Sequence, residues 1–182
     1  FADGRMILKD YCNYESAGDE DRRVRLDEEL RSCLREEGRD RFDVVAFSHA
    51  DDDHTHGAED FFWFDHADMY QGPGRVRIPE LWVPACSVLE VGPSGSARII
   101  RQEARHRFRK GYGIKVFGNP EPLEDWLQGE GIRPADRLHL IQKAGKCIPG
   151  FDRDDGRVEI FARSPFAYRG GGGGGGGSGD SL

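Results

Sequence analysis

The chain has 182 residues, of which 37% are hydrophobic and 32% charged, and its formal net charge is −7 at pH 7. This length suits one domain with a sizeable core, and no apolar run approaches the roughly 20 residues that a membrane span needs. The acidic balance argues against sequence-independent binding of nucleic acid over the whole surface. Such binding would need a locally basic segment.

Short apolar runs, typical of buried strands, alternate along the chain with amphipathic segments, typical of helices that cover a sheet. This alternation predicts an α/β layered fold. In chain order, the expected elements are strand 6–8, helix 19–35, strand 44–47, a helix within 58–70, strand 80–84, helix 97–110, strand 114–117, helix 123–128, strand 138–141 and strand 157–162.

The composition changes at the end of the chain. Gly170–Gly177 is an unbroken glycine run, followed by Ser-Gly-Asp-Ser-Leu. Glycine loses the most backbone entropy on ordering, so a flexible segment is expected, either a natural low-complexity loop or an artificial linker. We therefore divide the chain into a domain at 1–169 and a glycine-rich segment at 170–182.

The four cysteines are widely spaced and form no Cys-x-x-Cys pair. Cys33 shares a predicted helix face with Leu26, Leu30 and Leu34, so a small core residue is expected there rather than a ligand. The N-terminal residues show no basic-then-apolar leader pattern. Together these features favour a reducing, cytoplasmic location.

The most informative stretch is Ser48-His49-Ala50-Asp51-Asp52-Asp53-His54, directly after the apolar run 44–47. Bringing these imidazoles and carboxylates together costs free energy unless a cation neutralises them, and a divalent metal does this well. The stretch would lie at the carboxyl edge of a sheet, where α/β proteins usually build their sites. A solvated acidic turn, with His49 at a strand end, is the alternative. The strand context and the upstream His49 favour a metal-binding loop.

The segment 47–54 resembles the first metal-binding motif of the metallo-β-lactamase fold superfamily, commonly His-x-His-x-Asp-His followed by a glycine-rich turn. Asp51 stands where the second His usually does, a variant similar to soluble relatives of the hydrolase domain of DNA-uptake competence proteins. Arg5–Asp10 also resembles the early strand of that fold, which typically ends in an Asp. The resemblance covers most of the chain and implies an αββα sandwich that is incomplete at its C-terminal side.

The resemblance implies roles for five residues. His49 and Asp51 would bind one metal ion, and Asp53 and His54 a second. Asp53 would also orient the attacking water, which makes it the candidate catalytic residue, and Asp10 would support the site without being a ligand. The implied cofactors are two divalent ions, zinc by preference, with manganese or iron as alternatives.

Two departures from the family pattern are visible. Thr55-His56-Gly57 supplies one glycine after the motif where the family often has two, and His56 is expected at the surface. The family also uses a bridging Asp and further His ligands from later elements. His66, His106 and His139 do not match that context and are expected to be structural. Because 179–182 resembles the start of the strand that leads to the bridging Asp, we expect the missing ligands beyond Leu182.

A basic stripe lies in the predicted helix 97–110. Steps of three and four residues would align Arg98, Arg101, Arg105 and Arg109 on one face, as candidates for phosphate binding. The alternative is a solvated face paired with the many acidic groups of the chain. The aromatic run 61–64 is expected to pack in the core rather than to stack on bases.

These observations predict a metal-dependent hydrolase that uses metal-activated water on phosphodiester substrates such as nucleic acid. Two alternatives remain. One is a hydrolase of another ester or amide class within the same fold. The other is a catalytically degenerate module that binds metal or a regulatory partner. No membrane partner is expected, and protein partners and oligomeric state stay open.

Overall fold

The computed structural model describes residue 1 and residues 3–14, 24–92, 94–151 and 159–162. Five of the described strands form one parallel sheet in the order β1-β2-β3-β4-β5. They are β1 (Ile7–Lys9), β2 (Val44–Ala46), β3 (Glu80–Pro84), β4 (Ile114–Phe117) and β5 (Ile141–Gln142). The predicted α/β class is confirmed.

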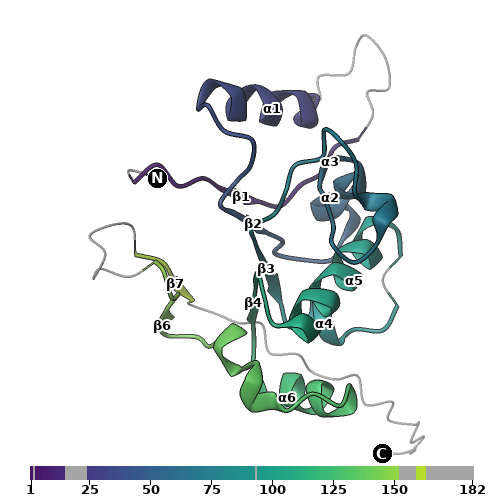
Figure 1. The fold of residues 1–182 in the computed structure, drawn as a ribbon, viewed down its shortest axis with the longest axis vertical. Coiled ribbons are helices and arrows are strands. Elements are labelled where there is room, and N and C mark those ends of the chain that lie inside the picture. The colour runs from purple at the N-terminus through teal and green to yellow at the C-terminus, as the bar shows by residue number, and fades with distance from the viewer. Residues whose placement is uncertain (2, 15–23, 93, 152–158, 163–182) are drawn as a thin grey trace, which may run out of the picture.

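Successive strands in the chain are also neighbours in the sheet, so right-handed crossovers place the connecting helices on the same face. Figure 1 shows α2 to α5 on one side of the sheet and the small β6–β7 hairpin on the other. The helices are α1 (Leu26–Glu36), α2 (Asp52–Thr55), α3 (Ala58–Phe61), α4 (Cys86–Leu89), α5 (Gly95–Lys110) and α6 (Pro120–Gly129), with short 3-10 turns η1 (Asp68–Tyr70), η2 (Pro134–Asp136) and η3 (Leu138–Leu140). No helix in the described ranges is long and apolar enough to cross a membrane.

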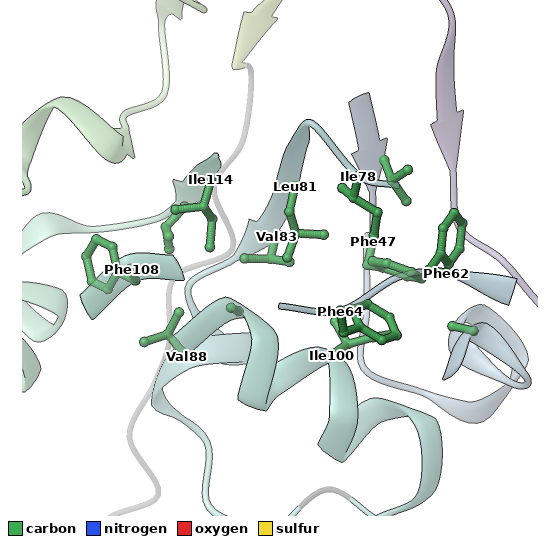
Figure 2. Close-up of a cluster of buried hydrophobic side chains, with 14 of the residues drawn as sticks. Phe47, Phe62, Phe64, Ile78, Leu81, Val83, Val88, Ile100, Phe108 and Ile114 are labelled. Atoms are coloured by element: carbon green, nitrogen blue, oxygen red, sulfur yellow. The ribbon is translucent and has the colours of Figure 1, made fainter. Parts of the chain in front are cut away.

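The main core lies between the sheet and the helical layer. Alternate strand residues point to one face, and Leu81, Val83 and Ile114 meet Ile100 and Phe108 of α5 there (Figure 2). All five side chains are buried. Burying each such side chain contributes about 1.5–3 kcal/mol relative to leaving it in water, so this face supplies most of the stabilisation of the sheet.

The other face of the sheet has a smaller apolar cluster. Val44 and Trp82 point there and pack against Ile148 and Phe151. The rings of Trp82 and Phe151 meet edge to face, with centroids 5.3 Å apart. Close by, β6 (Lys146–Cys147) pairs antiparallel with β7 (Phe161–Ala162). Residues 146–151 and 159–162 therefore bring apolar side chains to the face that the helices leave uncovered.

The start of α1 is capped from another part of the chain. The backbone N–H of Leu26 donates to Asn13 Oδ1 at 3.0 Å, while its own N-cap residue, Arg25, makes no side-chain cap. The predicted helix 19–35 is confirmed from Leu26 onward, and its first residues, up to 23, lie outside the described residues. Cys33 is exposed, so its predicted core position is wrong. Leu34 takes the buried position of this helix instead.

The predicted helix within 58–70 is wrong beyond Phe61. Phe62 is extended and bridges in parallel with Val76. In extended backbone, residues two apart point the same way, so Phe62 and Phe64 both reach the core and are fully buried. A helix would have sent these two rings in different directions, which explains why the chain leaves the helix there. The expected packing of the aromatic run is confirmed for Phe61, Phe62 and Phe64.

The predicted strand 138–141 is also largely wrong. Leu138–Leu140 form a 3-10 turn, because the N–H of Leu140 donates to the carbonyl of Arg137 at 2.9 Å. Pairing with β4 begins only at Ile141. Ile141 and Val116, which it faces, are both buried, whereas Leu138 is largely exposed.

Other boundaries agree closely. Strands 80–84 and 114–117 have the predicted bounds, and strand 6–8 is displaced by one residue, to Ile7–Lys9. Of the predicted strand 157–162, residues 157 and 158 lie outside the described residues, and pairing occurs at Phe161–Ala162. The predicted glycine-rich segment 170–182 lies entirely outside them.

Candidate metal centre

The candidate site lies where β1 and β2 end. These strands are parallel neighbours, so their carboxyl ends lie at the same edge of the sheet. Asp10 directly follows β1, and Ser48–His54 follows β2 and runs into α2. The N–H of Asp10 donates to the carbonyl of Ala46 at 2.7 Å, and the N–H of Tyr11 donates to the carbonyl of His54 at 3.0 Å. Two segments that are far apart in sequence are thus held together.

Asp10 is the structural centre of this arrangement. Its carboxylate accepts hydrogen bonds from the N–H of Ser48 at 2.6 Å and from the Ser48 hydroxyl at 2.7 Å, and its Oδ2 lies 3.1 Å from Nδ1 of His54. Burial alone would raise the pKa of the Asp10 carboxyl, but the hydrogen bonds from Ser48 and His54 outweigh it and hold the pKa below its usual value. Asp10 also has a left-handed φ of 57°, uncommon for a residue with a side chain. This strained backbone conformation directs the Asp10 carboxylate toward the loop, where Ser48 and His54 bind it.

We expect Asp10→Asn to destabilise the protein by about 2 kcal/mol, because an amide replaces a carboxylate that accepts several charge-assisted hydrogen bonds. Asn has the same shape and tolerates positive φ, so the change tests the charge rather than the backbone. The measurement is the urea midpoint at pH 7. Asp52→Asn, at an exposed carboxylate that bonds Tyr14 and His56, is the matched control and should barely move the midpoint. Equal shifts in both variants would contradict the central role of Asp10.

The two imidazoles of the motif lie side by side. The ring centroids of His49 and His54 are 4.9 Å apart, and Nδ1 of His49 lies 2.9 Å from the Ser48 hydroxyl oxygen. A carboxylate only accepts hydrogen bonds, so a neutral His54 places its proton on Nδ1, toward Asp10, and its lone pair on Nε2. Carboxylates orient metal-binding imidazoles in this way.

The carboxylates of the motif differ in their surroundings. Asp51 and Asp53 are exposed, and Asp53 Oδ2 lies 3.5 Å from Nε2 of His54. Asp52 instead accepts a hydrogen bond from the Tyr14 hydroxyl at 2.7 Å, which lowers the pKa of the Asp52 carboxyl. Asp53 is thus the motif carboxylate nearest to His54, and Asp52 belongs to a separate surface contact.

Residues 55–57 end the loop. His56 stacks on Tyr14, with ring centroids 4.2 Å apart, and is partly exposed. Gly57 has φ of 75°, and a Cβ there would lie 3.3 Å from the carbonyl oxygen of Asn13. This single glycine makes the turn from α2 into α3, where the family pattern often has two.

The donor set suits a divalent metal in chemistry, since imidazole nitrogens and carboxylate oxygens are the preferred ligands of zinc, manganese and iron. The described residues contain no group of three or more such side chains that could hold a metal ion as they stand. His49, His54 and Asp53 therefore form a partial set. The roles predicted for His49, Asp51, Asp53 and His54 as ligands stay predictions.

A hollow of about 480 Å³ opens beside the motif. It is lined in part by His49 and Asp51, and on its other side by Cys86 and Glu90. Burial raises the pKa of the Cys86 thiol. Neither Cys86 nor Glu90 belongs to a motif that the sequence makes visible. A signal was available, because Cys86 begins the helix that follows β3, and β3 is the sheet neighbour of β2.

The other histidines lie away from the motif. His66 follows the aromatic run in a turn, not in a helix, and its Nδ1 lies 2.9 Å from buried Glu103. His106 is on α5 beside the Tyr112 hydroxyl. His139 is exposed in the 3-10 turn η3, not inside a strand.

The predicted phosphate-binding stripe on α5 faces its own protein over most of its length. Arg101 donates to the carbonyl of Glu90 at 2.8 Å, and Arg105 donates to the carbonyl of Val88 at 2.7 Å. Arg109 forms a two-point ion pair with Glu130. Arg98 is exposed near the start of the helix. Phosphate binding by the stripe stays a prediction, with three of its four guanidinium groups already in contact with protein oxygens.

No family model matches the chain, and no curated protein or solved structure matches it.

Proposed function

We propose that this chain forms part of a metal-dependent hydrolase of the metallo-β-lactamase type, acting on phosphodiesters. The observation that carries the proposal is the Asp10–Ser48 pair, whose hydrogen bonds orient the imidazoles of His49 and His54 at the carboxyl edge of the sheet. The sheet adds support, because parallel strands in chain order place Asp10 and the motif on adjacent strand ends.

Each residue of the site would have a distinct role. His49, Asp51, Asp53 and His54 would hold two divalent ions, zinc by preference, which would supply Lewis acidity for cleavage of the ester. Asp53 would hold the nucleophilic water through its carboxylate and accept its proton. Asp10 would keep the proton of His54 on Nδ1, so that Nε2 faces the site. Phosphodiester is the proposed substrate class, and hydrolysis of another ester or an amide in the same site is the nearest alternative.

The test is metal content and hydrolysis measured on the full-length protein. We expect about two transition-metal ions per chain by elemental analysis, and metal-dependent cleavage of bis(p-nitrophenyl) phosphate. Asp53→Ala should abolish cleavage, a loss of at least about a hundredfold in kcat/KM, because the group that holds the water is gone. Carboxylic ester, thioester and amide substrates assayed in parallel decide between the substrate classes.

The matched control is Asp52→Ala, which removes a carboxylate one residue away that contacts Tyr14 and His56 instead of His54. It should keep most of the activity. Full activity in Asp53→Ala would contradict the mechanism. Metal binding without cleavage of any ester would favour the module that binds metal without catalysis.

A further inference from the structure

Five arginines line one groove on the surface of the protein. The groove has a volume of about 370 Å³ and lies between the C-terminal half of α1 and the segment that leads into β3. The lining arginines come from residues spread over 47 positions of the chain: Arg31, Arg35, Arg39, Arg75 and Arg77. The lining residues include one carboxylate, Asp40, which lies 3.7 Å from Arg41. A protein of net charge −7 thus has a strongly positive hollow.

The charges in this groove are poorly neutralised. Of the five arginines, Arg39 is the one with a carboxylate partner among the described residues, Asp43 at 2.6 Å. Arg31 donates from one terminal nitrogen to the carbonyl of Gly74, and Arg75 donates from one terminal nitrogen to the carbonyls of Glu59 and Phe62. A carbonyl does not cancel the charge, and each guanidinium keeps further N–H groups for a ligand.

Two of the arginines are the most available. Arg35 is exposed, and its guanidinium makes no hydrogen bond or ion pair within the described part of the chain. Arg77 is exposed, and its guanidinium lies over the Trp63 ring at 4.0 Å from the centroid. The guanidinium is planar and always charged, and contact with a ring face uses none of its N–H groups, so they remain suited to bidentate contact with phosphate.

The groove continues into a second hollow. Arg77 lines both, and the second hollow is also lined by Arg41 and Trp63. Its two carboxylates, Asp43 and Asp65, are ion-paired with Arg39 and Arg107. One phosphate would fill only part of this surface. An extended chain of phosphates, with flat bases able to lie against an indole, matches the row of arginines and the tryptophan together.

We propose that this arginine groove binds the phosphate backbone of a single-stranded nucleic acid. Arg39 precedes β2, and Arg75 and Arg77 precede β3, so the groove lies at the amino ends of the strands. The candidate metal centre is at the opposite, carboxyl edge of the same sheet. Binding in the groove is therefore independent of hydrolysis, and it would hold a strand at a point distant from the motif.

The test is binding of a fluorescein-labelled oligothymidylate of about 20 nucleotides, followed by fluorescence anisotropy in the presence of EDTA. Removing metal separates this test from that of hydrolysis. The double variant Arg35→Gln and Arg77→Gln should bind at least about tenfold more weakly at about 50 mM salt, and the slope of log K against log salt should fall by about 1.4, for two lost phosphate contacts. Both side chains are exposed, and an unchanged circular dichroism spectrum and melting temperature confirm that the variant is folded.

The matched control is Arg25→Gln and Arg133→Gln, which removes the same charge at exposed arginines paired with Glu28 and Asp136, outside the groove. It should bind as the wild type does. The groove proposal is overturned if the wild type does not bind, or if both double variants lose affinity equally. Competition by inorganic polyphosphate as strong as that by unlabelled oligothymidylate, phosphate for phosphate, would overturn the assignment to nucleic acid.

Discussion

Glu103→Gln is expected to destabilise the protein by about 3–5 kcal/mol, because it breaks a buried ion pair and leaves the buried guanidinium of Arg107 with the partly exposed Asp65 as its remaining charge partner. Glu103 is 0% exposed and Arg107 is 2% exposed. Nε of Arg107 donates to Oε1 of Glu103 at 2.5 Å, and the other oxygen of Glu103 accepts from the N–H of His66 at 2.9 Å. Arg107 also reaches Asp65 at 3.1 Å, so the pair ties the turn after the aromatic run to α5.

The chain offers a close control in a second ion pair of α5, whose acidic partner directly follows α6. Glu130 forms an ion pair with Arg109, but both partners are partly exposed. Glu130→Gln makes the same chemical change and should cost at most about 1 kcal/mol, as surface pairs do. Urea unfolding at pH 7 measures both variants. A cost for Glu103→Gln no larger than that for Glu130→Gln would show that the buried pair does not stabilise the fold.

The same pair predicts how stability depends on pH. Burial alone would raise the pKa of Glu103, but His66 and Arg107 outweigh it and lower the pKa from 4.5 to about 2. A carboxyl with a lowered folded-state pKa stabilises fully above its unfolded value and loses that contribution as the pH falls through the folded value. Between pH 4.5 and about 2 the wild type should therefore lose up to about 3 kcal/mol that Glu103→Gln does not lose. Parallel acid-unfolding curves for the two proteins would contradict this assignment.

Phe62→Ala is expected to cost about 3–5 kcal/mol, through lost burial and the cavity that remains. Phe62 is fully buried, and its ring lies 4.9 Å from that of Phe61 and 5.4 Å from that of Tyr11, centroid to centroid. Phe47 packs against it from the end of β2 (Figure 2). Tyr11 directly follows Asp10 and Phe47 directly precedes Ser48, so Phe62 supports both segments of the candidate site.

The measurement is the urea midpoint together with near-ultraviolet circular dichroism, which reports the packing of the aromatic cluster. Phe161→Ala, at a side chain that is 43% exposed, is the control and should cost less than about 1 kcal/mol. An equal loss of unfolding free energy in both variants would show that the cluster around Phe62 does not make a special contribution to stability.

The arginines show that a charge pattern in the sequence can define a helix face but cannot tell which groups contact that face in the fold. The regular spacing of Arg98, Arg101, Arg105 and Arg109 marks a helix face, but spacing does not say what covers it. In the fold, carbonyls of the segment around α4 and the carboxylate of Glu130 meet three of them. Arg31, Arg35 and Arg39 of the groove recur every four residues, but no spacing relates them to Arg75 and Arg77. Only the packing of α1 beside residues 74–77 brings the two sets together.

The sequence by itself determined the features that depend on neighbouring residues. The apolar runs 80–84 and 114–117 became strands with those bounds, and the alternation of runs and helices produced the α/β class. The motif at 48–54 also lies at a strand end, as its position after a buried run predicted. Hydrophobic periodicity is a local signal, so it survives without knowledge of the rest of the chain.

Tertiary structure alone decided what depends on distant partners. Asp10 meets Ser48 across 38 residues, and Asn13 caps α1 in place of the local residue. The aromatic run left its helix at Phe62 because Val76 offered a strand-like partner and the core accepted both Phe62 and Phe64. Burial, capping and charge pairing are set by which segments pack together, and that choice minimises the free energy of the whole chain rather than of any one window.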